Sequence, residues 1–167
     1  MRKIALIGFA LAAVTSAQAS IVITLSQGNY SFDGSGNYLT DEVLTLSTVS
    51  GLNAGDTLHY VCQNIVGGSG TATFSNGTDQ LIFDVTVNHA VVNGVTSSDD
   101  GNWTYDAAST GVFAGMTGSG TFNQSFHANA NQFAASQFVG DLEVVPEPAS
   151  MIALGAGAAA VIRRRRK

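Results

Sequence analysis

Carboxylates are the most numerous groups in this chain that could do chemistry. Eleven of its twelve Asp and Glu residues lie between Ser20 and Val145, a stretch that contains no Lys or Arg. Two carboxyl groups brought together by a fold could hydrolyse a glycosidic bond, one as an acid and the other as a base or nucleophile. The sequence singles out no such pair. We therefore expect a protein that is not an enzyme, with a secreted hydrolase as an alternative.

Carboxylates could also bind calcium, which prefers oxygen ligands. Four residues are spaced like the ligands of a calcium-binding loop: Asp33, Ser35, Asn37 and Asp41. Such a loop needs a glycine at its turn and a bidentate glutamate at its end, but Tyr38 and Leu44 stand at these positions. We expect solvated turn residues here and no cofactor, with a weak calcium site as the alternative.

The chain has one cysteine, Cys62, so it cannot form an intramolecular disulfide. A buried position in a strand suits a lone cysteine, which packs as a small apolar side chain. A nucleophilic thiol would need a nearby base, and the three histidines are scattered singly: His59, His89 and His127. We expect a buried Cys62, with pairing between chains or a free reactive thiol as the alternative. We expect no zinc site, because the histidines lack metal-ligand spacing.

Positive charge is confined to the two ends of the chain. All seven Lys and Arg residues lie there, so the net charge of −5 conceals a central stretch of about −11. Binding to nucleic acid or to anionic lipid requires cations on the protein, and we exclude both partners for this stretch. Divalent cations and extracellular polysaccharide are better candidate partners.

The N-terminus has the three parts of a secretory signal peptide. A short cationic segment precedes an apolar run over residues 4–14, and the small residues Ala17 and Ala19 follow it. An Ala-x-Ala site after such a run is typical of signal-peptidase cleavage. The run is too short to span a bilayer, which takes about twenty apolar residues. We predict that residues 1–19 are a signal peptide, cleaved after Ala19.

The C-terminus also has three parts in a fixed order. A motif at residues 145–150 opens with Val145, Pro146, Glu147 and Pro148. Proline has no N–H and keeps the residue before it extended, so this segment should present its carboxylate on a stiff, accessible strand. A processing enzyme could grip such a segment.

The rest of the tail should enter a membrane and stop there. Residues 151–162 are apolar and predict a transmembrane helix, shorter than the roughly 30 Å hydrocarbon core. Each following cation would cost about 2.5–3.5 kcal/mol at the membrane centre, so the cluster should stay in the cytoplasm. The residues of this membrane stop are Arg163, Arg164, Arg165, Arg166 and Lys167.

This order of motif, apolar helix and basic cluster resembles the PEP-CTERM sorting signal, also catalogued as the ice-binding protein C-terminal domain. The resemblance rests on Pro146-Glu147-Pro148 and on the segments 151–162 and 163–167. It implies a precursor held transiently in the inner membrane of a Gram-negative-type bacterium, and processing by an exosortase. The mature protein would lie at the cell surface or in a biofilm matrix. A carbohydrate- or calcium-binding module carrying the same tail is the alternative.

The stretch between the two ends, residues 20–144, reads as one exported β-domain. Asn-Gly and similar pairs typical of tight turns separate short apolar or alternating runs. This pattern predicts an all-β antiparallel sandwich or small barrel. The predicted strands are 21–25, 43–49, 57–64, 81–87, 103–105, 121–126 and 137–144. The predicted turns are 33–37, 53–56, 76–77, 93–94, 99–101 and 118–120.

A glycine-rich segment at 111–122 resembles a hairpin found in several exported bacterial β-proteins and, more loosely, in dirigent-like barrels. Its glycines suit tight turns and close strand packing. A phosphate-binding loop would need a helix and a lysine after it, and the sequence provides neither.

Overall fold

A single antiparallel β-barrel makes up the computed structural model, which describes residues 18–32, 37–63, 65–93, 96–127 and 133–145. A short 3₁₀ helix, η1 (Gly111–Phe113), precedes the seventh of the eight strands. The strands are β1 (Gln18–Phe32), β2 (Asn37–Ser47), β3 (Thr57–Gln63), β4 (Ser69–Ser75), β5 (Gln80–Asn93), β6 (Thr96–Tyr105), β7 (Met116–His127) and β8 (Phe133–Val144).

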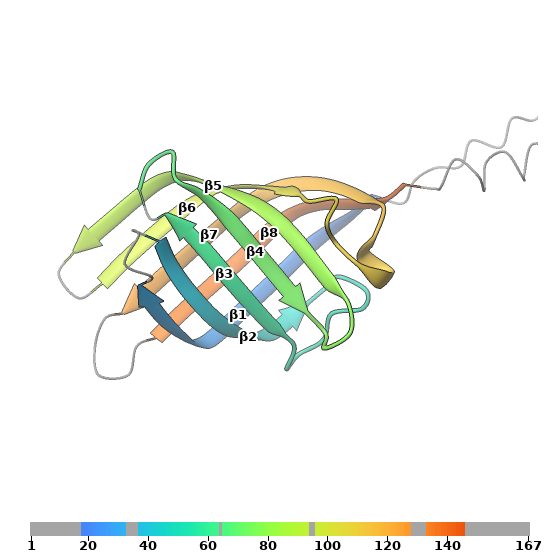
Figure 1. Ribbon diagram of the computed structural model, residues 1–167, viewed down its shortest axis with the longest axis horizontal. Coiled ribbons are helices and arrows are strands. Elements are labelled where there is room, and N and C mark those ends of the chain that lie inside the picture. The colour runs from blue at the N-terminus through green and yellow to red at the C-terminus, as the bar shows by residue number, and fades with distance from the viewer. Residues whose placement is uncertain (1–17, 33–36, 64, 94–95, 128–132, 146–167) are drawn as a thin grey trace, which may run out of the picture.

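Each strand pairs with the next one in the sequence, and β8 returns to pair with β1, so the barrel is closed (Figure 1). The prediction of an all-β antiparallel fold is confirmed, and of the two architectures that it left open the barrel is correct. Closure pairs every strand on both sides, which removes the exposed sheet edges that favour aggregation.

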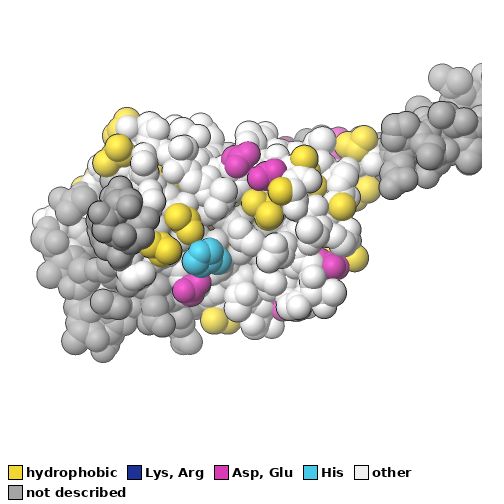
Figure 2. Space-filling view, in the orientation of Figure 1, with side chains coloured by type: hydrophobic (Ala, Val, Ile, Leu, Met, Phe, Trp, Pro, Cys, Tyr) yellow, Lys and Arg dark blue, Asp and Glu magenta, His cyan; other side chains and the backbone are white. Residues whose placement is uncertain are grey.

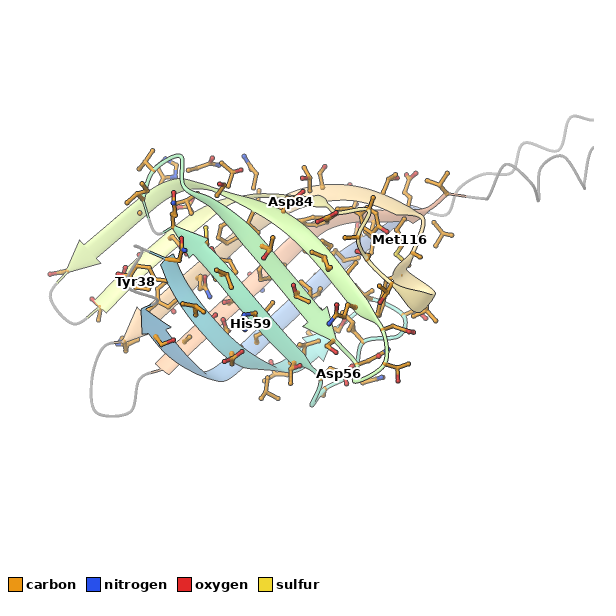
Figure 3. All side chains as sticks on the ribbon, viewed as in Figure 1. Tyr38, Asp56, His59, Asp84 and Met116 are labelled. Carbon is orange, nitrogen blue, oxygen red and sulfur yellow. The ribbon has the colours of Figure 1, made fainter. Side chains whose placement is uncertain are left out.

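An even number of strands places the start of β1 and the end of β8 at the same end of the barrel. Gln18 pairs with Glu143, and Ala19 pairs with Leu142. We call this the tail end, at the right in Figure 1. The opposite, distal end is where β3 and β7 finish and where β2, β6 and β8 begin. Figure 3 shows Tyr38 near the distal end and Asp56 at the tail end.

Buried and more exposed side chains alternate along the strands, and the buried ones fill the interior. In β3, Leu58, Tyr60 and Cys62 are buried, whereas the residues between them are more exposed. The largest interior side chain is Trp103, whose ring stacks on Phe83 with the centroids 4.1 Å apart. The Trp103 Nε1–H is shared between two backbone carbonyls, those of Thr121 at 3.1 Å and Val139 at 3.2 Å.

Two glycines make room for this tryptophan. A Cβ atom built on Gly120 would lie 2.7 Å from the Trp103 ring, and one built on Gly140 would lie 2.6 Å from it. Gly120 and Gly140 are opposite each other on β7 and β8. The glycine-rich segment therefore serves close packing, as predicted, but it is not a hairpin. It consists of η1 and the first part of β7.

Loops close the tail end of the barrel with apolar side chains. Val49 and Leu52 from the β2–β3 connection are buried, and so is Phe113 of η1. Tyr105 holds η1 in place, because its hydroxyl donates a hydrogen bond of 2.9 Å to the Phe113 carbonyl. Burial of these side chains plugs this end with hydrophobic contacts.

Three features of the predicted β-domain are wrong. Strand β4 was not predicted, because Gly70 and Ala72 give its inward face small side chains rather than the branched ones typical of strands. Residues 99–101 and 118–120, predicted as turns, lie inside β6 and β7. There the small residues allow neighbouring side chains and backbone to approach closely.

The turns at 53–56 and 76–77 are confirmed, with positive φ angles of 99° at Gly55 and 87° at Gly77. The predicted signal helix and transmembrane helix lie outside the described residues, apart from positions 18 and 19, which begin β1. In the part of the chain that the structure describes, no helix has the length and apolar character needed to cross a membrane.

Candidate functional site

The tail end of the barrel carries the junction to the C-terminal motif. Strand β8 ends at Val144, and the Val145 N–H donates a hydrogen bond of 3.2 Å to the carbonyl of Gly115. Val144 and Val145 are both exposed. The barrel therefore holds the backbone up to the residue that precedes Pro146.

The remaining residues of the predicted sorting motif and membrane stop lie outside the described residues: Pro146, Glu147, Pro148, Arg163, Arg164, Arg165, Arg166 and Lys167. Of the predicted signal-cleavage residues, Ala17 lies outside them as well. Ala19 pairs with Leu142 in the barrel, and cleavage after Ala19 stays a prediction. It would leave Ser20 first, whose hydroxyl donates a hydrogen bond of 3.0 Å to Asp141.

A second candidate site lies inside the barrel, in the half nearer the distal end. Six polar side chains point inward from five strands and form what we call the buried polar layer. Each strand contributes the fourth residue from its distal terminus, which corresponds to a depth of about 10 Å, and β2 adds a second residue. The layer consists of Thr40, Glu42, Tyr60, Asp99, Gln124 and Ser136.

Hydrogen bonds converge on one oxygen of Glu42. Its Oε1 accepts from the Ser136 hydroxyl at 2.6 Å, from Gln124 Nε2 at 2.9 Å and from the Thr40 hydroxyl at 3.1 Å. These contacts link β2, β7 and β8 through the barrel interior. Strand β6 joins the layer because Asp99 is opposite Gln124 in the register.

Both carboxyl groups of the layer hold protons more tightly than usual. Burial raises the pKa of Glu42, and the three hydrogen bonds to its Oε1 offset only part of this effect. Burial raises the pKa of Asp99 to about 7. The Tyr60 hydroxyl lies 3.5 Å from Asp99 Oδ2, a distance at which a hydrogen bond is weak, and the adjacent Asp100 carboxylate adds repulsion.

Three acceptor atoms of this layer have no hydrogen-bond partner within the described structure: Glu42 Oε2, Asp99 Oδ1 and Gln124 Oε1. The three side chains are 1%, 4% and 2% exposed. Buried polar atoms of native proteins are nearly always hydrogen-bonded, and each exception requires an explanation. The polar layer is therefore the most unusual chemical feature of the barrel interior.

Cys62 is buried beside this layer, as expected, and burial raises its pKa to about 11. A thiol with such a pKa is protonated at neutral pH and is a poor nucleophile. The histidines cannot activate it. His59 and His89 are on the outer face of the barrel and contact Asp41 at 2.7 Å and Asp100 at 2.9 Å, respectively. His127 follows the inward-facing Phe126.

The residues considered for calcium binding are described only in part. Asn37 and Asp41 belong to strand β2 rather than to a turn, and positions 33 and 35 lie outside the described residues. Among the described side chains, no group of three or more His, Cys, Asp and Glu is placed to hold a metal ion. Figure 2 shows His and carboxylate side chains side by side on one face of the barrel, and no Lys or Arg there.

Sequence reasoning missed the polar layer. The usable signal was a spacing of two residues along a strand. Glu42 is two residues before Leu44, and Asp99 is four residues before Trp103. In a strand, residues two apart share a face, so extending each strand backwards from its apolar residues would have placed both carboxylates inside.

Comparison with known proteins identifies the tail. No curated protein and no solved structure matches the chain, whereas the family model of the PEP-CTERM protein-sorting motif matches residues 144–167. The match begins at the last residue of β8, so the motif follows the barrel without a linker. The chain therefore carries a PEP-CTERM protein-sorting motif at residues 144–167, and such a motif implies an exported, membrane-anchored precursor that an exosortase-like enzyme processes.

Proposed function

We propose that this protein is a non-enzymatic component of the cell surface or extracellular matrix of a Gram-negative-type bacterium. Its barrel is exported, held briefly at the inner membrane by the C-terminal tail, and then freed from the tail by an exosortase-like enzyme. The observation that carries this proposal is the direct succession of a closed barrel and a sorting motif at residues 144–167.

The junction sets the position of the barrel during processing. Val145 is hydrogen-bonded to the barrel, and the apolar run begins at Met151. The intervening residues span at most about 20 Å when extended. The tail end of the barrel therefore lies close to the membrane, and the distal end faces away from it. A membrane-embedded enzyme would reach Pro146 to Pro148 just below the barrel.

The cysteine and two of the histidines support a role other than catalysis. The only cysteine is buried and protonated at neutral pH. His59 and His89 bind their aspartates on the exposed outer surface, where water screens both pairs. A secreted hydrolase, the alternative, predicts turnover of a glycan or ester that is lost when one particular carboxylate is changed.

The proposal is tested by measuring the intact mass of the protein in its native host. We expect wild-type protein to lack residues 1–19 and the C-terminal tail. The double variant Pro146→Ala, Pro148→Ala should accumulate as a membrane-bound species that still ends at Lys167, because the motif loses its fixed extended shape.

The matched control is Glu143→Gln, which removes a carboxylate from β8 just before the motif. This variant should be processed like wild type, whereas Glu147→Gln within the motif should accumulate as precursor. Equal processing of the proline double variant and wild type would contradict the proposal.

A further inference from the structure

The unpartnered atoms of the buried polar layer all have the same chemical character. Every donor in the layer already has an acceptor: the Thr40 and Ser136 hydroxyls and the Gln124 amide bond Glu42, and the Tyr60 hydroxyl faces Asp99. The atoms left over are oxygens of Glu42, Asp99 and Gln124 that can only accept when the carboxyl groups are ionised. A complementary ligand must therefore donate hydrogen bonds.

The charge of the layer is also uncompensated. It contains two carboxyl groups, and the barrel sequence from Ser20 to Val145 contains no Lys or Arg that could pair with them. Burying an unpaired carboxylate is costly. A cation from outside would relieve this cost, and the overall charge of the barrel favours its approach.

Aromatic rings lie on both sides of the layer. Towards the distal end, Tyr38 of β2 stacks on Phe126 of β7, with the ring centroids 5.3 Å apart. Towards the tail end, Phe122 contacts Tyr60 of the layer, with the centroids 6.0 Å apart. Ring faces attract cations, and aromatic rings also suit the short alkyl group of an organic amine.

The acceptors are neighbours in the fold. Asp99 and Gln124 are opposite each other on adjacent strands, which places their side chains on the same inner face. Gln124 Nε2 is 2.9 Å from Glu42 Oε1, so the third acceptor group adjoins the first two. Three such oxygens match the three N–H bonds of a primary ammonium group in number. A sugar fits less well, because its hydroxyl oxygens would find no free donor.

We propose that the buried polar layer binds a small organic cation with a primary ammonium group, which donates its N–H bonds to Glu42 Oε2, Asp99 Oδ1 and Gln124 Oε1. The ligand enters from the distal end, which faces away from the membrane in the anchored precursor. The site is independent of sorting, because Val145, which precedes the motif prolines, and the layer lie in opposite halves of the barrel.

The test is calorimetric titration of the full-length protein in a neutral detergent at pH 8 and constant ionic strength. The probe is ethylammonium chloride. The comparison probes are tetramethylammonium, which has charge but no N–H, glucose, which is a neutral polyol, and calcium chloride. We expect saturable one-to-one binding of ethylammonium alone.

Matched variants on single strands locate the site. Glu42→Gln and Asp99→Asn each remove a charge-assisted hydrogen bond and should weaken ethylammonium binding about tenfold or more. Asp41→Asn and Asp100→Asn remove the same charge one residue away, on the outer face. These two variants should change the affinity by less than about twofold, since exposed charges are screened.

A measurement on the wild-type protein tests the proposal even if a variant fails to fold. Ethylammonium, but not tetramethylammonium at equal concentration, should raise the thermal unfolding midpoint, because a ligand that binds only the folded state stabilises it. The proposal is overturned if ethylammonium gives neither saturable heat nor a shift. Preferential binding of glucose or calcium, or equal losses in the inner and outer variants, would overturn it as well.

Discussion

Asp99 should make the barrel less stable as the pH rises through neutrality. Burial raises its pKa from 3.8 to about 7, so the folded state binds this proton more tightly than the unfolded chain does. The stabilisation from the bound proton is fully present below the unfolded pKa and is lost as the pH rises through the folded pKa. Asp99 therefore makes the folded barrel more stable at acid pH than at alkaline pH, whereas a salt-bridged aspartate has the opposite effect.

The magnitude follows from the difference between the two pKa values. At 1.36 kcal/mol for each pKa unit, ionisation of Asp99 should lower the free energy of unfolding by about 4 kcal/mol between pH 4 and pH 8. For a domain of this size, such a loss corresponds to roughly 10–15 °C in the unfolding midpoint. Glu42 contributes in the same direction, because burial raises its pKa too.

The assay is urea unfolding of the exported protein between pH 4.5 and pH 8.5, followed through the fluorescence of its one tryptophan. Trp103 is 1% exposed and stacks on Phe83, so its emission should report the loss of the interior. The amide side chain introduced by Asp99→Asn cannot ionise. The variant should be about as stable as wild type near pH 4 and more stable at pH 8.

Asp100→Asn is the control for overall charge. Its side chain lies on the outer face next to His89, so the variant lowers the general repulsion by the same single charge but leaves Asp99 in place. We expect it to keep most of the wild-type dependence on pH, because burial is the main cause of the raised pKa of Asp99 and repulsion from Asp100 is a smaller one. If the Asp99→Asn and wild-type profiles are parallel, the account of Asp99 is refuted.

Three substitutions and one chemical modification test the packing. Gly140→Ala should destabilise the barrel in urea by about 2 kcal/mol or more, since the added methyl group meets the Trp103 ring at 2.6 Å; Gly55→Ala, with open space but a φ of 99°, should cost about 1 kcal/mol. Phe113→Ala should cost about 3–5 kcal/mol in the same assay, because it removes a fully buried ring from the tail-end plug. Cys62 should resist a thiol reagent in native protein at pH 8 and react after unfolding, which mass spectrometry would show, because burial raises its pKa to about 11.

The sequence predicted the parts of the fold that depend on local pattern. Alternation identified strand positions such as Leu58 and Leu81, and Asn76-Gly77 correctly marked the turn between β4 and β5. Local pattern failed where small residues serve long-range packing. The pattern around Gly118 and Gly120 predicted a turn, but both residues lie in β7. There Gly120 leaves room for Trp103, which is distant in the sequence.

The two candidate sites differ in how far the sequence could predict them. The sorting motif is a contiguous segment, so the order of its residues along the chain is enough to recognise it. The prediction of its family is confirmed at residues 144–167. The polar layer draws its members from five strands. Asp99 and Asp100 are adjacent and identical in type, and only the register of β6 decides which of them is buried.

The closure of the barrel determines how these two sites are arranged. A meander of eight strands returns the chain to the end where it began, so the tail leaves next to β1. With seven strands the tail would leave from the opposite end, beside the polar layer, and membrane attachment would cover the approach to that layer. In the observed topology, Phe113 closes the tail end, while the layer lies about 10 Å inside the other end. The topology therefore allows the proposed anchoring and the proposed ligand binding to take place at the same time.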